Sequence, residues 1–192
     1  MDCTFAKRPN SGLKIVIVNG RPGSGKTTFE EFCQEILGNP YCEMRSTIDK
    51  VKDIAYRIGW DGEKDARSRK FLSDLKDLCE EYNEMSTQDI LFHIEDWEQD
   101  LIYYDLIEKF HVFFIDDREP EHIEKLKQLL NAQTLLVRRP GDEELKTSNH
   151  ADEQVFDYKY DFVIENHLDL DYFKKEAELF LQLLKGEVEE EE

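Results

Sequence analysis

Positive charge is scarce in this sequence: 25 lysine and arginine residues stand against 44 aspartate and glutamate residues, a formal net charge of −19. Because neutralisation of phosphates by lysine and arginine supplies most of the affinity for nucleic acids, a nucleic-acid partner is not expected. An anionic membrane surface is disfavoured for the same reason. An anionic small molecule is compatible with this balance only if basic side chains gather in one cleft, so the arginines and lysines are the positions to follow.

Paired cysteines and long apolar runs are also missing. The four cysteines (Cys3, Cys33, Cys42 and Cys79) form no Cys-x-x-Cys pair and no cluster with zinc-ligand spacing. The first twelve residues are polar and lack an apolar run of signal-peptide length, and every other apolar run is strand-sized. We therefore expect reduced thiols and a cytoplasmic protein without a membrane span.

What the sequence does contain is a regular alternation of apolar strands and helical patterns. A chain of 192 residues with 40% hydrophobic content suits one packed domain, here residues 1–186, followed by an acidic tail at 187–192. The short, mostly apolar segments predicted as strands are Leu13–Val18, Tyr41–Arg45, Val112–Ile115, Thr134–Val137 and Asp161–Ile164.

Helical spacing fills the intervals between these strands. Cap-like signals, Ser46-x-x-Asp49 and Ser86-x-x-Asp89, predict two helix starts. Other helices are predicted at Thr27–Leu37, from Phe71 to Tyr82, at Glu119–Leu130 and around Phe173–Leu184. The alternation predicts an α/β fold with a mainly parallel central sheet between two helical layers. The polar stretch at about 139–157 is predicted to be a lid.

The sharpest motif is Gly20-Arg21-Pro22-Gly23-Ser24-Gly25-Lys26-Thr27, which has the pattern G-x-x-x-x-G-K-[ST]. It follows an apolar strand and precedes a helix, with Thr28 in the first turn. A glycine-rich turn in this setting directs backbone N–H groups and a helix N-terminus at phosphates. Lys26 is expected to reach the β- and γ-phosphates of ATP, and Thr27 to offer its hydroxyl to Mg²⁺.

Missing motifs narrow the class of P-loop protein. The sequence has no Asn-Lys-x-Asp guanine-reading motif, and the strand Val112–Ile115 ends in Asp-Asp-Arg rather than the Asp-Glu of AAA-type ATPases. A small-molecule kinase needs a phosphate loop, an acceptor cleft and a lid with arginines, and this sequence has a candidate for each.

At this point the chain resembles the nucleoside-monophosphate-kinase-like branch of P-loop proteins, in particular the phage deoxynucleoside monophosphate kinases and the animal-type phosphomevalonate kinases. The resemblance rests on the phosphate loop, on Phe113–Arg118, on Arg138-Arg139 before the polar stretch, and on the late strand Phe162–His167. It extends over essentially the whole chain and implies a three-layer α/β/α P-loop NTPase fold with a lid. The loop Gly59–Asp65 has no counterpart in this resemblance.

Asp116, Asp117 and Arg118 follow a buried strand, at the sheet edge where ligands bind in this architecture. One aspartate is expected to order Mg²⁺ or orient the acceptor, and Asp116 is the candidate metal ligand. The alternative is that Asp117 caps the helix at Glu119. The resemblance implies that Arg118 binds the acceptor phosphate, whereas the alternative is a surface ion pair.

Further basic residues complete the candidate set. Arg138 and Arg139 are candidate lid arginines that stabilise charge during transfer. Arg45, Ser46 and Arg69 are candidate acceptor-binding residues, although Ser46 also suits a cap. The polar segment Asn149–Glu153 is interpreted as a solvated loop.

The sequence thus predicts an ATP- and Mg²⁺-dependent kinase for a small phosphorylated acceptor, with a (deoxy)nucleoside monophosphate favoured. One alternative is a kinase of phosphomevalonate or another small phosphate. The other is a nucleotide-binding regulatory protein without a small acceptor. Neither the acceptor nor the oligomeric state can be inferred from these patterns.

Overall fold

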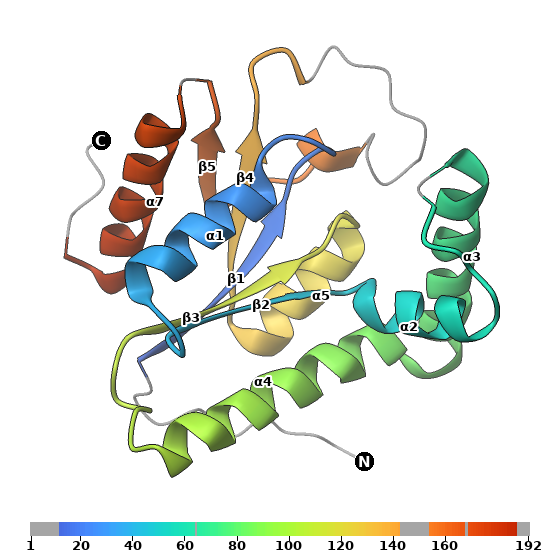
Figure 1. Cartoon of the computed structure of the whole chain (residues 1–192), viewed down its shortest axis with the longest axis horizontal. Coiled ribbons are helices and arrows are strands. Elements are labelled where there is room, and N and C mark those ends of the chain that lie inside the picture. The colour runs from blue at the N-terminus through green and yellow to red at the C-terminus, as the bar shows by residue number, and fades with distance from the viewer. Residues whose placement is uncertain (1–11, 64, 143–153, 168, 188–192) are drawn as a thin grey trace.

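A five-stranded sheet forms the centre of the computed structural model, which describes residues 12–63, 65–142, 154–167 and 169–187 (Figure 1). The strand order is β2-β3-β1-β4-β5, and every pair of neighbours is parallel. The mainly parallel sheet is therefore confirmed, and each predicted strand lies within one residue of the observed one. The strands are β1 (Leu13–Asn19), β2 (Cys42–Ser46), β3 (His111–Asp116), β4 (Gln133–Arg138) and β5 (Phe162–Glu165).

Helices cover both faces of this sheet (Figure 1), as the alternation predicted. On one face α1 and α7 pack against alternate strand residues such as Val16 and Phe114. On the other face α4 and α5 pack against Ile17 and Phe113. The result is the three-layer α/β/α arrangement of P-loop NTPases. The helical segments are α1 (Lys26–Leu37), α2 (Asp49–Arg57), α3 (Ala66–Asn83), α4 (Met85–Tyr103), α5 (Pro120–Leu130), the 3₁₀ segment η2 (Gln154–Phe156) and α7 (Leu170–Lys185).

Two of these helices, α2 and α3, lie beyond the carboxyl end of β2 (Figure 1). The apolar spacing from Phe71 to Tyr82 predicted a helix, and α3 confirms it, but Leu78 is 64% exposed and Tyr82 is 86% exposed. The reason is that α3 packs beside α2 and α4 rather than over the sheet, so part of its apolar stripe is uncovered. The only buried residue of α3 is Lys76.

The two predicted cap signals have different outcomes. At the start of α2, the Asp49 carboxylate accepts the N–H of Ser46 (2.9 Å), although the N-cap residue is Ile48. The prediction that Ser86 caps α4 is wrong, because α4 begins at Met85 and its N-cap is Glu84. Since α3 ends directly before α4, the Glu80 carboxylate is close enough to accept the Ser86 N–H instead (3.0 Å).

The carboxyl ends of the strands meet at one edge of the sheet, where the phosphate loop joins β1 to α1. Most of the predicted lid (143–153) and of the acidic tail (188–192) lies outside the described residues. Within the residues that are described, no helix has the length and apolarity needed to cross a membrane.

Candidate phosphate-binding site

The loop between β1 and α1 has backbone geometry that requires glycine. Gly20, Gly23 and Gly25 have φ values of 152°, 82° and 107°, a range that side chains with a Cβ rarely adopt. A Cβ on Gly20 would lie 2.2 Å from the carbonyl oxygen of Val137, and a Cβ on Gly25 would lie 2.5 Å from Nδ2 of Asn166. At Gly20 the loop therefore passes too close to the β4 backbone for a larger residue, at Gly25 a larger residue would require Asn166 to move, and at Gly23 only the positive φ favours glycine.

Asn19, the last residue of β1, holds the loop at its start. Its side-chain oxygen accepts the N–H of Gly20 (2.7 Å), and its amide nitrogen donates to the hydroxyl of Tyr160 (2.7 Å). Asn19 is fully buried. Sequence reasoning did not single it out, although a polar residue that ends an otherwise apolar strand was an available signal.

Lys26 and the two threonines begin α1 immediately after the loop. The Lys26 ammonium folds over the loop and donates to the carbonyl oxygens of Gly20 and Arg21. Thr27 is exposed beside it and Thr28 is half-buried. At the tip, Pro22 and Gly23 are exposed, and Ser24 is buried. This arrangement gives the loop, the helix N-terminus and Lys26 a shared opening that suits phosphate oxygens.

Asp116 ends β3 and lies next to β1, paired in register with Val18. Burial raises the pKa of its carboxyl group, the charges of Lys26 and Arg118 oppose this shift, and that of Asp49 adds to it. The carboxyl of Glu30, one turn after Lys26 on α1, has a pKa raised further by burial and by Asp116. Glu30, which sequence reasoning missed, is thus an acidic neighbour of the loop.

The Asp116 carboxyl group provides a test of whether Mg²⁺ fits beside the phosphate loop. Oδ1 of Asp116 is buried and has no hydrogen-bond partner among the described residues. A hard cation prefers carboxylate and hydroxyl oxygens, and the Thr27 hydroxyl lies on the same opening. No group of three His, Cys, Asp or Glu side chains in the described ranges forms a fuller site. The fit is therefore to a cation that takes its remaining ligands from phosphate and water, as Mg²⁺ does.

Asp117 has different surroundings from Asp116. Its side chain is completely buried and contacts Nζ of Lys76 (3.4 Å) and Nδ1 of His122. It also accepts the backbone N–H groups of Arg118 (2.8 Å) and Glu119 (3.4 Å). Burial would raise its pKa, but the His122 hydrogen bond and the Lys76 charge outweigh burial and lower it to about 2. These contacts favour a structural role for Asp117 over metal binding, but the predicted helix cap is not observed, because the N-cap residue of α5 is Glu119 and it has no side-chain cap bond.

The candidate acceptor residues are placed around the β2 side of this edge. Arg118 is exposed beside Asp116, whose pKa its charge lowers. Arg45 pairs with Glu43 on the same strand (3.1 Å). Ser46 ends β2, and its backbone N–H donates to the Asp49 carboxylate. Arg69 is exposed in the first turns of α3. The structure brings Arg118 and Ser46 to the strand ends, whereas Arg69 lies on the helix beyond the sheet edge.

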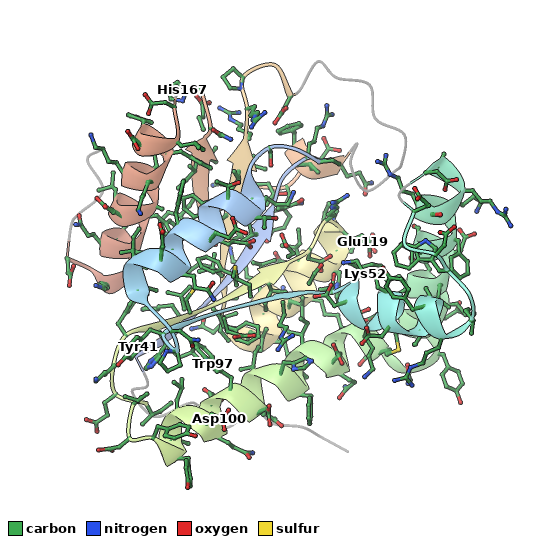
Figure 2. The ribbon with its side chains drawn as sticks, in the orientation of Figure 1. Tyr41, Lys52, Trp97, Asp100, Glu119 and His167 are labelled. Carbon is green, nitrogen blue, oxygen red and sulfur yellow. The ribbon has the colours of Figure 1, made fainter. Side chains whose placement is uncertain are left out.

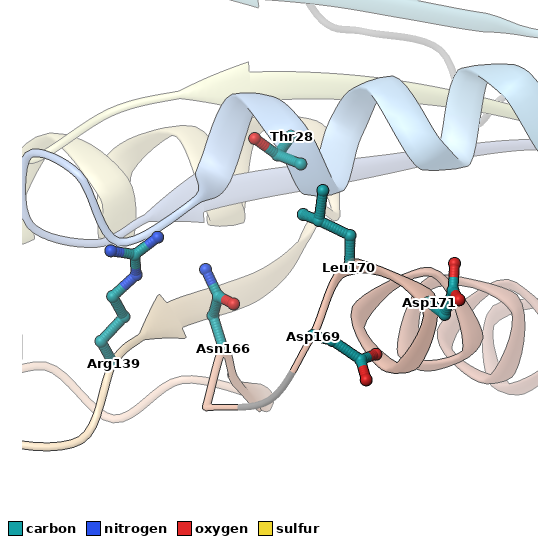
Figure 3. A pocket seen from close by; sticks show the side chains of 6 residues that line it. All are labelled: Thr28, Arg139, Asn166, Asp169, Leu170 and Asp171. Carbon is teal, nitrogen blue, oxygen red and sulfur yellow. The ribbon is translucent and has the colours of Figure 1, made fainter.

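The two candidate lid arginines have different surroundings. Arg138 pairs with Glu165 across β4 and β5. Arg139 points the other way, toward α1, and lines a hollow of about 550 Å³ (Figure 3). The hollow lies between the start of α1 and the turn that precedes α7. Its other lining residues are Thr28, Asn166, Asp169, Leu170 and Asp171.

Arg21 turns its side chain away from the phosphate opening. Although it lies in the loop, it is 93% buried: its guanidinium donates to the carbonyl oxygen of Asp142 and lies 5.0 Å from the ring centre of Phe156. Asp142 in turn accepts the N–H of Arg139 (2.6 Å). The side chain of Arg21 therefore connects the loop to both ends of the predicted lid, a role that its place in the motif did not indicate.

Comparison with known proteins shows similarity of the backbone fold only. No protein-family model and no curated protein matches the sequence. A Chloroflexus aurantiacus protein has a TM-score of 0.48 at 12% identity, covering 90% of this chain and 98% of that one. Ehrlichia chaffeensis thymidylate kinase has a TM-score of 0.44 at 16% identity, with 89% and 100% covered. A sugar kinase of a Janibacter species has a TM-score of 0.43 at 12% identity, with 91% and 97% covered. At these values, the chemistry of the site has to be inferred from this chain's own residues.

Proposed function

We propose that this chain is an ATP- and Mg²⁺-dependent small-molecule kinase that phosphorylates a small phosphorylated acceptor, with a (deoxy)nucleoside monophosphate favoured. One observation carries the proposal. The phosphate loop with Lys26 and Thr27 opens onto the same strand ends as Asp116, whose buried oxygen has no partner among the described residues. Phosphoryl transfer requires this combination of phosphate donors, a cation ligand and an adjacent acceptor space.

The hollow beside the loop supports a nucleotide as the donor. Its volume of about 550 Å³ lies within the usual range for small-ligand sites. The planar guanidinium of Arg139 suits stacking on a base, and Leu170 offers an apolar contact on the side of Thr28 (Figure 3). A base in this hollow would lie next to the N-terminus of α1, which suits the attached phosphates.

The chemistry assigned to these residues is charge neutralisation and alignment. An acceptor phosphate oxygen attacks the γ-phosphorus, the bond from that phosphorus to the β,γ-bridging oxygen breaks, and ADP leaves. Lys26 and the loop N–H groups hold the phosphates while charge shifts to the leaving oxygen. Mg²⁺, held by Thr27 and Asp116, would supply further neutralisation. A strong general base is not required, because transfer depends mainly on position and charge.

The acceptor side is assigned to the β2, α2 and α3 segment beside the strand ends, which carries Arg45, Lys50, Lys52, Arg57, Arg67, Arg69 and Lys70. Four of these side chains pair with carboxylates, Arg45 with Glu43, Lys50 with Asp89, Lys52 with Asp49 and Lys70 with Asp74. The charge of Lys52 also acts on Asp116, so α2 borders the same strand ends. Individual basic side chains such as Arg57 and Arg69, rather than a positive surface, are therefore the candidates for binding an anionic acceptor.

The experiment is acceptor profiling with purified protein, ATP and Mg²⁺. ADP formation is measured against ribo- and deoxynucleoside monophosphates, phosphomevalonate and unphosphorylated nucleosides. We expect turnover with at least one nucleoside monophosphate. Turnover with phosphomevalonate alone would select the alternative kinase. Tight ATP binding without turnover on any acceptor would contradict the kinase proposal and favour a regulatory protein.

A matched pair of variants connects turnover to the loop. Lys26→Ala should lower turnover at least about 100-fold, because no other side chain of the loop can neutralise the transferred group. Lys14→Ala, which removes an exposed lysine from the same strand and helix unit, should leave turnover unchanged. Circular dichroism of both variants verifies that each is folded. Unaltered turnover in Lys26→Ala would exclude the loop as the donor site.

A further inference from the structure

A buried ionic cluster lies behind the candidate site, between α3, α4 and α5. Asp117 is at its centre, with Lys76 of α3 on one carboxylate oxygen and His122 of α5 on the other. Lys76 and His122 are 6% and 7% exposed, and Asp117 is 2% exposed. Lys76 also contacts Glu119 (3.0 Å). Oppositely charged groups thus compensate one another where water is largely excluded.

The outer half of this cluster orients His122. Its Nε2 lies 3.0 Å from the hydroxyl of Thr87, and that hydroxyl donates to Glu80 (2.8 Å). Because the single Thr87 proton goes to Glu80, the hydroxyl accepts from Nε2, while Nδ1 faces the Asp117 carboxylate. The ring is thereby held between Asp117 on one side and Thr87, which bonds to Glu80, on the other.

The cluster determines the backbone path at the reacting edge. Oδ1 of Asp117 accepts the N–H groups of Arg118 and Glu119, and the Asp117 N–H donates to the carbonyl oxygen of Val18 (3.1 Å). The turn from Asp116 to Glu119 is thereby fixed between β1 and α3. Asp116 and Arg118, the groups that face the opening, are carried on this turn.

Lys76 is the element of the cluster that packing does not explain. It is the only buried residue of an 18-residue helix, and it lies four residues after Leu72 and three before Cys79, where an apolar side chain would suit. Burial would lower its pKa, but the charges of Asp117 and Glu119 outweigh burial and raise it. A buried ion pair contributes little net stability compared with an apolar contact, so its value is expected to be geometric.

We propose that Lys76 is a positioning residue. From α3 it holds Asp117 and so places Asp116 and Arg118 relative to the acceptor-side helices α2 and α3. The proposal rests on the proposed kinase function where turnover is the measurement. The placement of the turn can also be measured without turnover.

The first experiment compares Lys76→Met and Lys76→Arg with Lys125→Met. Lys125 contacts Glu80 of the same cluster (3.2 Å) but is more exposed, and no contact joins it to Asp117 in the described part of the chain. Because a small misplacement of reacting groups can cost about 10²-fold in rate, we expect Lys76→Met to lower kcat by roughly that factor and to raise the acceptor KM. The ATP Kd should stay within about twofold. Lys76→Arg should recover most of the loss, and Lys125→Met should match the wild type.

The second experiment measures hydrogen exchange of the peptide containing Arg118 and Glu119, whose amides bond to Asp117. Exchange should be faster in Lys76→Met and unchanged in Lys125→Met. If Lys76→Met does not fold, Lys76→Gln, which keeps a donor without the charge, takes its place. Unchanged exchange, or an equal kcat loss in Lys125→Met, would overturn the proposal. If the wild type turns over no acceptor, the kinase function fails and the exchange result alone decides whether Lys76 positions the turn.

Discussion

The side-chain amide of Asn166 donates to the backbone carbonyl oxygen of Ser24 (2.9 Å), and the N–H of Asn166 donates to Arg138 (2.8 Å). One residue after β5 is therefore bonded both to the phosphate loop and to the end of β4. Because the same amide lies where a Cβ on Gly25 would be, it also defines how close the loop comes to the sheet. Asn166 also lines the hollow of about 550 Å³ beside the loop.

Asn166→Ala should weaken nucleotide binding because the loop loses this anchor. A hydrogen bond of this kind contributes about 1 kcal/mol, so we expect an increase in the ATP Kd of about 5- to 10-fold, with kcat less affected. Isothermal titration calorimetry measures the change. His167→Ala is the matched control, because His167 is the exposed neighbour of Asn166. Equal weakening in both variants would mean that the turn as a whole, rather than the Ser24 contact, is responsible.

Asp116→Asn and Asp117→Asn should separate activity from stability. Asp116→Asn removes a carboxylate charge that we propose holds Mg²⁺, so turnover should fall about 100-fold. Its stability should be unchanged or slightly higher, since burial disfavours the ionised form of Asp116. Asp117→Asn removes the buried carboxylate between Lys76 and His122, although Lys76 keeps Glu119 and His122 keeps Thr87. We expect a loss of about 3 kcal/mol in unfolding free energy. Urea unfolding and turnover are measured on both proteins. If Asp116→Asn lost stability and Asp117→Asn lost only turnover, the catalytic and structural roles of the two aspartates would have to be exchanged.

Acid should destabilise the protein through Asp117. Its folded pKa of about 2 is below the ordinary 3.8, so the ionised carboxylate stabilises the fold above pH 4. This contribution, about 2 kcal/mol, is lost as the pH falls from about 4 through 2, because the unfolded chain takes up the proton first. In Asp117→Asn, this part of the pH dependence of the unfolding free energy should disappear.

His111 should make the stability of the protein depend on pH in a second, milder way. It is fully buried at the start of β3, and its ring contacts those of Tyr41 and Trp97. Figure 2 labels these two aromatic residues. Burial lowers its pKa below the ordinary 6.5, so the neutral ring is favoured in the folded protein. As the pH falls below about 6.5, the unfolded chain binds a proton before the folded one, and stability should decline. His111→Gln should flatten this slope in thermal unfolding measured from pH 7 to 5, whereas His167→Gln, at an exposed site, should not.

The phosphate loop could be predicted from sequence because all its donors come from consecutive residues. Four of the five strands could be predicted because each contains a short apolar run, whereas β2 (Cys42–Ser46) carries Glu43, Arg45 and Ser46 and gave a weaker signal. The surroundings of Asp117 could not be predicted, because its partners come from two different helices. Lys76 lies 41 residues before Asp117 in the sequence, and His122 lies five residues after it. A lysine within the apolar spacing of α3 was a visible signal, but its partner was not. Likewise Thr28, Arg139 and Leu170 form one hollow only after the chain folds.

Arg21 should connect nucleotide binding to the two segments that flank the predicted lid. It bonds to Asp142 and lies over Phe156, and Asp142 orients the Arg139 backbone. Arg21→Ala should therefore misplace Arg139, raise the KM for ATP about tenfold, and lower unfolding free energy by about 1–2 kcal/mol through the lost stacking and hydrogen bond. Phe156→Leu removes only the ring and should reproduce the smaller, stacking part of both effects. If Arg21→Ala abolishes kcat while KM and stability stay at wild-type values, Arg21 acts directly on the phosphates, and its contacts with Asp142 and Phe156 are not the cause.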